Sequence, residues 1–225
     1  MSFRQSFNRR RFVASGSLAA TSLAFPWVSV RKVLGANSRL NIAAIGAGGK
    51  GGVDIGYCAE ENVVALCDVD SRNAAGAFKK FPKASIYQDF RDLFDKESGH
   101  IDAVTISTPD HTHAHPAIMA MRAGKHVYCQ KPLTHTVEEA RILTRIARET
   151  GVVTQMGNQG HSQTESRRLV ELIRAGVIGD VREAHIWTDR PIWPQGLTRP
   201  AEVQAVPDTI NWDLWLGPAP ERPYH

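Results

Sequence analysis

Six residues, Gly46 to Gly51, limit the fold of this chain more than any other segment. They follow an apolar run at 41–45 and precede a second apolar run at 63–67, which leads directly into Asp68. Glycines at the first, third and sixth positions allow a tight turn, a close approach of bound phosphates to the backbone, and close packing of a helix on a strand. The pattern predicts a strand, a glycine turn, a helix, a second strand and an acid, which is the order that holds a dinucleotide.

The predicted cofactor site begins at this turn. A helix that starts there presents unpaired N–H groups and a partial positive charge to the phosphates of a ligand. The Asp68 carboxylate can accept hydrogen bonds from the adenosine ribose hydroxyls and repels a 2′-phosphate, which favours NAD over NADP. A glycine turn without a ligand is the alternative. The predicted cofactor-binding residues of this unit are Gly46, Ala47, Gly48, Gly49, Lys50, Gly51 and Asp68.

The first 36 residues have the composition of a targeting segment. Three arginines at 9–11 precede a weakly apolar stretch at 12–30, which serine and threonine dilute. This arrangement predicts a twin-arginine signal, and therefore export to the periplasm or cell envelope through the twin-arginine machinery. A disordered or weakly anchored basic arm is the alternative, and small residues at 22–24 and 35–36 offer two cleavage sites.

The positive charge of the chain is concentrated in this leader. The whole chain has a formal net charge of +4, from 27 basic and 23 acidic residues. The first 36 residues contain six of the basic residues and no acidic one, so the remainder has 21 basic and 23 acidic residues, a net charge of −2. A body with this charge argues against a nucleic-acid partner.

The sequence also argues against a disulfide-stapled protein and a membrane-spanning one. The three cysteines, Cys58, Cys67 and Cys129, have neither the arrangement of a disulfide framework nor the spacing of a metal site. Cys67 lies in an expected strand and is predicted to be a small buried hydrophobe. No segment after the leader is apolar for long enough to cross a bilayer.

Between positions 39 and 157, short apolar runs alternate with helical patterns, which is typical of an α/β fold. We predict that these residues form an NAD-binding domain with a Rossmann-type, doubly wound parallel sheet. The expected strands are 41–46, 62–68, 84–87, 101–107, 126–130 and 152–157, and the expected helices are 50–60, 71–80, 89–97, 114–123 and 137–149.

The pattern changes after position 157. A helix is expected at 166–175 and a strand at 181–188, where polar and apolar residues alternate. One helix and one strand cannot bury a core of their own. Residues 158–225 are therefore predicted to begin a second, α+β domain with an open antiparallel sheet, which is incomplete in this chain.

Two further loops are expected at the carboxyl edge of the parallel sheet, where such sheets bind ligands. Residues 108–113 follow the fourth strand and residues 130–132 follow the fifth. Both loops should face the nicotinamide half of a bound dinucleotide. Lys131 can hydrogen-bond a substrate hydroxyl and assist the transfer of its proton, which makes it the predicted catalytic residue. A solvated loop lysine is the alternative.

These loops carry a resemblance to a known family. The chain resembles the glucose–fructose oxidoreductase / inositol dehydrogenase / MocA (Gfo/Idh/MocA) family in three ordered motifs: Thr108-Pro109 with His113, Gly124-Lys125-His126-Val127, and Lys131-Pro132. The resemblance extends from about position 41 to position 218. The family's usual signature is Glu-Lys-Pro, and here Gln130 replaces the glutamate. The replacement keeps the lysine but removes a charge that could hold it.

The resemblance implies roles for these residues and for the whole protein. Thr108, Pro109 and His113 would bind the nicotinamide side of the cofactor, and Lys131 would contact the cofactor and position the substrate. The family's second domain carries substrate contacts and commonly an acid/base histidine, and its sheet usually joins subunits into homo-oligomers. Because the sequence ends before that region, the chain resembles the N-terminal part of a family member, either a natural truncation or a fragment.

Histidine and tryptophan clusters admit other interpretations. His111, His113 and His115 alternate as zinc ligands in a strand would, but they span a loop and the start of a helix, so no metal site is predicted. The tryptophans either stack on a sugar ring or belong to a core or an interface. They are Trp187, Trp193, Trp212 and Trp215.

The favoured hypothesis is an NAD-dependent oxidoreductase that transfers a hydride between nicotinamide and a hydroxyl-bearing carbon of a sugar or polyol. One alternative is an NAD-dependent glycoside hydrolase that uses the same site for transient oxidation. Another is a nucleotide-binding fragment with no catalysis of its own. Net formation of NADH separates the first two hypotheses, and cofactor binding without turnover would favour the third.

Overall fold

The computed structural model describes residues 39–189 and 194–225 of the chain. The predicted export signal at 1–36, with its two cleavage positions, lies outside the described residues, and so does Trp193. The residues from Arg39 onward belong to a single unit.

The centre of the fold is a sheet of six parallel strands. Their order along the sheet is β3-β2-β1-β4-β5-β6, so the chain builds outward from β1 on one side and then returns to its other side at β4. Open parallel sheets bind ligands at this kind of switch, beyond the carboxyl ends of the strands. The predicted Rossmann-type, doubly wound fold is confirmed. The strands are β1 (Asn41–Ile45), β2 (Asn62–Cys67), β3 (Ser85–Tyr87), β4 (Ala103–Ile106), β5 (His126–Gln130) and β6 (Thr154–Gly157).

Both faces of β1 are buried, which explains why its sequence is apolar without alternation. Ile42 and Ala44 pack in one apolar cluster, whereas Ala43 and Ile45 pack in another. None of the four is more than 6% exposed. Successive side chains of a strand point to opposite faces, so a strand that is apolar at every position needs cover on both.

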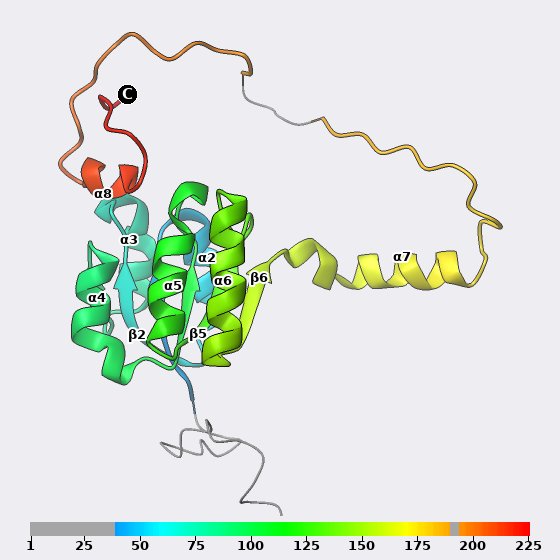
Figure 1. Cartoon of the computed structure of the whole chain (residues 1–225), viewed down its shortest axis with the longest axis horizontal. Helices are drawn as coiled ribbons and strands as arrows, with labels where there is room; N and C mark the ends of the chain where they lie inside the picture. The colour runs from blue at the N-terminus through cyan, green and yellow to red at the C-terminus, as the bar shows by residue number, and fades with distance from the viewer. Residues whose placement is uncertain (1–38, 190–193) are drawn as a thin grey trace, which may run out of the picture. The chain divides into compact units, whose positions relative to one another are not determined.

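Five helices provide this cover. The first two contribute buried residues to the cluster around Ile42, and the next three to the cluster around Ala43. Figure 1 shows α4, α5 and α6 together as the near layer. The helices are α2 (Gly49–Tyr57), α3 (Ser71–Lys80), α4 (Phe90–Glu97), α5 (Ala114–Arg122) and α6 (Val137–Thr150), with short 3-10 turns at η1 (Ser98–His100) and η2 (Asp110–Thr112).

Local side-chain contacts set the ends of these helices. Thr136 and Glu139 form a capping box at the start of α6: the Glu139 N–H donates to Thr136 Oγ1 at 3.2 Å, and the Thr136 N–H donates to Glu139 Oε2 at 2.9 Å. Gly151 ends α6 in the left-handed region, with a φ of 66°. The Asp70 side chain accepts hydrogen bonds from the first turn of α3 and so begins that helix close to the end of β2.

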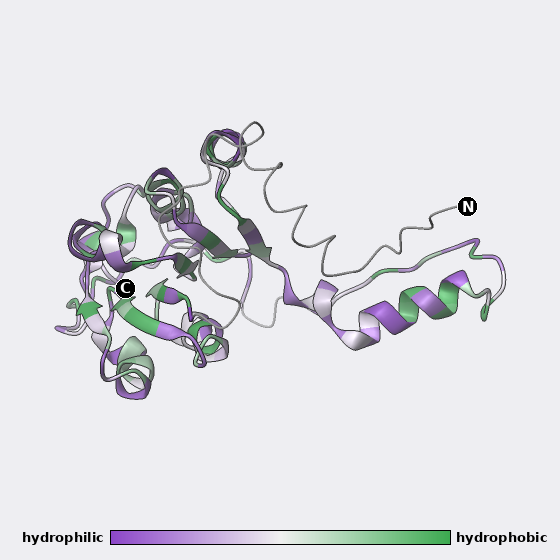
Figure 2. Cartoon of the chain, turned by 90° about the horizontal axis from the view of Figure 1, so that it is seen from below, coloured by the Kyte–Doolittle hydropathy of each residue, from purple (hydrophilic) through white to green (hydrophobic). Residues whose placement is uncertain are grey.

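Beyond β6 the chain leaves the sheet. A 3-10 turn, η3 (Gln159–Ser162), leads into α7 (Thr164–Arg174), which confirms the helix expected at 166–175. None of the α7 side chains is buried, and Figure 2 shows polar and apolar residues alternating along it. Neither α7 nor any other helix in the described ranges has the length and apolar character needed to cross a membrane.

The prediction of a strand at 181–188 is wrong, since the described residues form no regular element there. Alternation of polar and apolar residues is not sufficient for a strand, because a strand also needs a neighbour to pair its backbone groups. The next element is the short helix α8 (Trp212–Leu216). The division into domains at 39–157 and 158–225 stays a prediction.

Candidate functional site

The glycine turn depends on contacts that a side chain would prevent. Gly46 has a φ of 79°, and its N–H donates to the carbonyl oxygen of Cys67 at 2.8 Å. A Cβ atom at Gly51 would lie 1.6 Å from the carbonyl oxygen of Gly46. Gly46 and Gly51 are therefore in direct contact, and the turn packs directly on the start of α2.

The remaining turn residues lie in different environments. Ala47 is fully buried beneath the turn. Gly49 and Lys50 are exposed at the start of α2, and Gly49 has a φ of 50°. Exposed N–H groups at the start of this helix are available to a phosphate, so the assignment of the turn to a cofactor stays a prediction with a suitable geometry.

The Asp68 carboxylate connects the turn to the end of β2. Its Oδ2 accepts from the Gly48 N–H at 2.7 Å, and its Oδ1 accepts from the Asp70 N–H at 2.9 Å. A carboxylate has about four lone-pair sites, so both oxygens retain capacity for ribose hydroxyls. A Cβ atom at Gly48 would lie 2.3 Å from the Asn73 side chain, so this glycine also leaves room for a polar side chain of α3.

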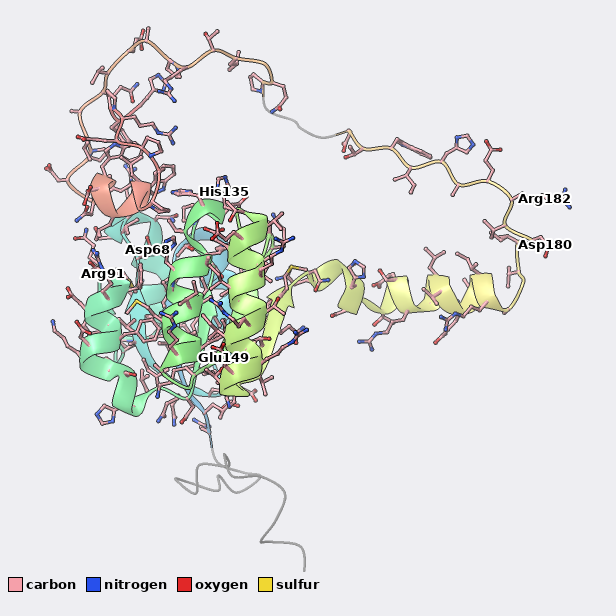
Figure 3. All side chains as sticks on the ribbon, viewed as in Figure 1. Asp68, Arg91, His135, Glu149, Asp180 and Arg182 are labelled. Atoms are coloured by element: carbon pink, nitrogen blue, oxygen red, sulfur yellow. The ribbon has the colours of Figure 1, made fainter. Side chains whose placement is uncertain are left out.

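Asp68 is largely buried, with 9% of its surface exposed. Burial raises the pKa of its carboxyl above the ordinary value, although hydrogen bonds from the N–H groups of Asp70 and Gly48 oppose the rise. The side chain therefore holds its proton to a higher pH than a solvated aspartate does. Figure 3 shows Asp68 toward the α8 end of the sheet, where the cavity described next opens.

A cavity of about 580 Å³ lies between the glycine turn, the end of β2 and the loop after β4. Its lining includes Gly48, Asp68, Asn73 and Thr108. Thr108 Oγ1 is buried without a hydrogen-bond partner among the described residues. A buried hydroxyl in this state costs free energy unless a ligand or water pairs with it. The residues therefore fit the adenosine and pyrophosphate parts of a dinucleotide, which offer both donors and acceptors.

The residues predicted in the loop after β4 lie in different environments. Thr108 and Pro109 line the same cavity as Asp68, and their contact with the nicotinamide side stays a prediction. His113 is only 1% exposed; its Nδ1 lies 2.6 Å from the Pro132 carbonyl oxygen and its Nε2 lies 2.8 Å from the Thr108 carbonyl oxygen. Both ring nitrogens of His113 face backbone carbonyls, and its contact with the cofactor stays a prediction. His113 joins the loops that follow β4 and β5.

Lys131 lies exposed in the loop after β5, next to a buried polar network. Its N–H donates to Gln130 Oε1 at 3.1 Å, and Gln130 Nε2 donates to Asp54 Oδ2 at 2.8 Å. The same oxygen of Asp54 accepts from Ser107 Oγ at 2.8 Å, and its other oxygen pairs with Lys50 Nζ. Gln130 itself has no charge, but a buried carboxylate is still present beside it, because Asp54 of α2 supplies one.

The three alternating histidines diverge in the structure. His111 Nε2 lies 3.0 Å from the Trp215 carbonyl oxygen, His113 lies inside the protein, and His115 lines the cavity. In the part of the chain that the structure describes, no group of three or more His, Cys, Asp or Glu residues is placed to hold a metal ion.

The cysteines are free thiols, and Cys67 is the one of the three that lines the cavity. Burial raises the pKa of the Cys129 thiol to about 12 and raises that of Cys67 further. Thiols with such pKa values remain protonated at neutral pH and behave as small apolar residues. The predicted burial of Cys67 is confirmed.

Residues 40–158 match the Gfo/Idh/MocA family model, an oxidoreductase family with an NAD-binding Rossmann fold. The match covers more than half of the 225 residues. The chain belongs to the Gfo/Idh/MocA oxidoreductase family. The family match supports a nicotinamide cofactor, and the resemblance seen in the motifs is confirmed.

Curated Gfo/Idh/MocA relatives include sugar and polyol dehydrogenases. D-glucoside 3-dehydrogenase of Escherichia coli (strain K12) is 30% identical over 149 residues, which cover 64% of this chain and 42% of the relative. Inositol 2-dehydrogenase of Rubrobacter xylanophilus is 29% identical over 155 residues, with coverage of 64% and 42%. The crystal structure of myo-inositol 2-dehydrogenase from Lactobacillus plantarum superposes with a TM-score of 0.59 at 26% identity, covering 64% of this chain and 43% of that one. The chain thus spans less than half the length of these Gfo/Idh/MocA relatives.

Three parts of the site were not selected from the sequence. Asp54 had a signal, since it lies three residues after Gly51 on the helix that begins at the turn. Asn73 had a weaker signal, in the first turn of the helix after Asp68. In residues 209–218 the sequence drew attention only to Trp212 and Trp215, and it did not place them here, because only tertiary folding brings this segment to the edge of the sheet.

Proposed function

We propose that this chain binds NAD in preference to NADP. The observation that carries the proposal is the buried Asp68 carboxylate, which lines the cavity beside the glycine turn. A ribose 2′-hydroxyl can donate a hydrogen bond to it, whereas a 2′-phosphate meets a like charge. Arg91 also lines the cavity, but its Nη2 pairs with Asp89 Oδ2 at 2.6 Å, so its charge is already engaged.

We further propose that the chain is the nucleotide-binding part of an oxidoreductase that acts on a sugar or polyol hydroxyl. Support comes from the relatives named as D-glucoside 3-dehydrogenase and inositol 2-dehydrogenase. Nicotinamide, when bound, exchanges a hydride with the carbon that bears the hydroxyl. Lys131 Nζ hydrogen-bonds that hydroxyl and assists the movement of its proton. Gln130 and Asp54 hold the loop that presents Lys131.

A panel of sugars and polyols tests the reaction, with the absorbance of NADH as the readout. Net NADH formation supports the oxidoreductase. Release of sugar from glycosides without net NADH supports the NAD-dependent glycoside hydrolase instead. NADH binding with no turnover of any compound supports a nucleotide-binding chain without catalysis of its own.

Asp68→Ala is expected to weaken NADH binding by about 10-fold to 100-fold, because hydrogen bonds to a charged group contribute about 1.5–3 kcal/mol. NADPH binding should weaken less, so the difference between the NADH and NADPH affinities becomes smaller. Fluorescence titrations with NADH and NADPH measure both affinities. Asp95→Ala, which removes an exposed carboxylate of α4 outside the cavity, is the control and should bind as the wild type does. Unchanged NADH affinity in Asp68→Ala would exclude the ribose contact.

The raised pKa of Asp68 adds a pH signature to this assignment. As the pH falls, Asp68 takes up a proton at a higher pH than an ordinary aspartate does. The negative charge that repels a 2′-phosphate is then lost. The wild-type preference for NADH over NADPH should therefore shrink on acidification. The 2′-phosphate of NADPH itself titrates at about pH 6. The preference of Asp68→Ala, measured over the same pH range, therefore supplies the baseline. An equal change of preference in both proteins would contradict the assignment.

We also propose that residues 1–36 direct export through the twin-arginine route. The three arginines at 9–11 and the weakly apolar stretch after them support this proposal. A reporter fused to residues 1–36 is expected in the periplasm. Replacing Arg9 and Arg10 by lysine should retain the reporter in the cytoplasm, and equal export of both fusions would contradict the route.

A further inference from the structure

Residues 209–218 return to the sheet beside the end of β2. Backbone contacts join 209–211 to 69–71: an isolated antiparallel bridge between Asp70 and Ile210, flanked by hydrogen bonds of 2.9 Å and 2.8 Å. The stretch 69–71 follows the acid at the end of β2 directly. The returning segment is therefore anchored next to the predicted ribose site.

A second anchor holds the segment to the loop after β4. His111 Nε2 lies 3.0 Å from the carbonyl oxygen of Trp215 and 3.1 Å from that of Leu216, at the carboxyl end of α8. Leu216 is buried, and a Cβ atom at Gly217 would lie 3.0 Å from the Thr112 side chain. His111, which the sequence placed with two other histidines, thus acts as a contact for α8.

The two anchors lie on opposite sides of β1, because β2 and β4 are its neighbours in the sheet. The segment therefore crosses the carboxyl edge of the sheet where the glycine turn lies, and it lines the same cavity as Asp68. A dinucleotide held with its phosphates at the turn and its ribose at Asp68 would have its base on the β2 side and its nicotinamide toward β5 and Lys131. The cavity residues of the segment are Ile210, Asp213, Leu214, Trp215, Gly217 and Pro218.

Other residues of the C-terminal part of the chain hold the Trp215 ring in place. The Trp212 ring stacks on it, with 4.8 Å between centroids and 13° between planes. Trp212 Nε1 donates to the Arg222 carbonyl oxygen at 2.9 Å, and Tyr224 meets the Trp212 ring edge-on at 5.0 Å. An indole held this way loses little conformational freedom when a ligand packs against it.

We propose that residues 209–218 form a wall of the adenine pocket, in which Leu214 and Trp215 supply the apolar contact to the base. The inference rests on the proposed NAD binding and extends it to a segment more than a hundred residues away from the glycine turn in sequence. It assigns Trp212 and Trp215 to the cofactor site rather than to a sugar-binding surface. The wall contributes to binding of the adenosine half and leaves the nicotinamide half untouched.

Titrations of the full chain with NADH and with reduced nicotinamide mononucleotide (NMNH) test the proposal, because NMNH lacks the adenosine half. Trp215→Ala is expected to weaken NADH binding about tenfold, the size of one base–aromatic stacking contact. NMNH affinity should stay within about twofold of the wild-type value. Trp187→Ala is the matched control, since Trp187 is 85% exposed and lies outside the cavity, and it should leave both affinities unchanged.

Equal NADH affinity in Trp215→Ala and the wild type would overturn the adenine wall, and so would equal losses for NADH and NMNH. If circular dichroism shows that Trp215→Ala does not fold, Leu214→Ala removes apolar surface from the same wall with a smaller change and is judged by the same two titrations. The wild-type titration separates a failure of the proposed NAD binding from a failure of the proposed adenine wall. A wild type that does not bind NADH contradicts the NAD proposal itself, whereas wild-type binding with unaffected variants contradicts the wall alone.

Discussion

Gly51→Ala is expected to lower the free energy of unfolding by about 3 kcal/mol, because the added methyl group has no space. Its carbon would lie 1.6 Å from the carbonyl oxygen of Gly46 and 3.1 Å from the Ser107 side chain. Relief requires the turn to move away from α2, and the turn is held in place by the hydrogen bond between Gly46 and Cys67. NADH affinity should fall at least about tenfold with the displaced turn. Thermal unfolding and NADH titration measure the two effects.

Gly76→Ala is the matched control for this prediction. Gly76 lies in α3 with an exposed position, and a Cβ atom there would meet nothing within 4 Å. The same substitution should therefore raise the free energy of unfolding by up to about 1 kcal/mol, since alanine is the better helix former. If Gly51→Ala melts within a degree or two of the wild type, the contact between the two glycines does not constrain the turn.

Gln130→Glu is expected to destabilise the fold by about 3–5 kcal/mol at neutral pH, because it faces a second buried carboxylate. Gln130 is 4% exposed and Asp54 is 6% exposed, and the Gln130 amide donates to Asp54 Oδ2 at 2.8 Å. An ionised carboxylate at position 130 would repel Asp54, so the folded variant either bears this repulsion or takes up a proton at neutral pH, and both cost stability. Gln155→Glu, at an exposed position of β6, introduces the same charge and should change stability by less than about 0.5 kcal/mol.

Acidification should restore much of the stability of Gln130→Glu. The folded variant keeps one shared proton between the two carboxyls, which raises the pKa of the introduced group, whereas the unfolded chain has released that proton at neutral pH. The free energy of unfolding therefore falls as the pH rises and recovers as the pH falls, relative to the wild type. Chemical denaturation at several pH values measures this difference. A destabilisation that does not depend on pH would contradict a shared proton.

Asp54→Asn combined with Gln130→Glu should recover most of the lost stability, because the exchange restores one amide facing one carboxylate. The coupling between the two positions is obtained from the double-mutant cycle, and it should exceed about 1 kcal/mol. Additive effects of the two substitutions would show that Asp54 and Gln130 do not act as a pair. The cycle also tests why Gln130 occupies the place of the glutamate expected from the family signature.

The regular elements between positions 39 and 157 were predictable because each has a local cause. β1 is apolar at every position because both of its faces are covered, and Gly46 marks the turn by its positive φ. The same local reasoning failed at 181–188, where alternation suggested a strand and the described residues form none. Pairing with a neighbouring strand is a tertiary property, and the local pattern does not contain it.

The site was predictable only where a side chain acts through its place in a motif. Asp68 and the glycines are positioned by the strand and the turn next to them in sequence. His113 shows the limit: the sequence places it after β4, but only the fold shows that its ring lies between the carbonyls of Thr108 and Pro132. Contacts of this kind depend on how two loops meet, and neither loop alone specifies them.

By itself, the sequence determined the Rossmann-type sheet, the glycine turn and the acid at the end of β2, because these follow from apolar periodicity and from the steric needs of one tight turn. Only the tertiary structure decided which groups meet at the carboxyl edge of the sheet. It paired Gln130 with Asp54 of α2, engaged His111 with the end of α8, and placed Trp215 beside the cavity that Asp68 also lines. These partners are far apart along the chain, and their contacts arise from the packing of loops at the carboxyl edge of the sheet, which local sequence patterns do not encode.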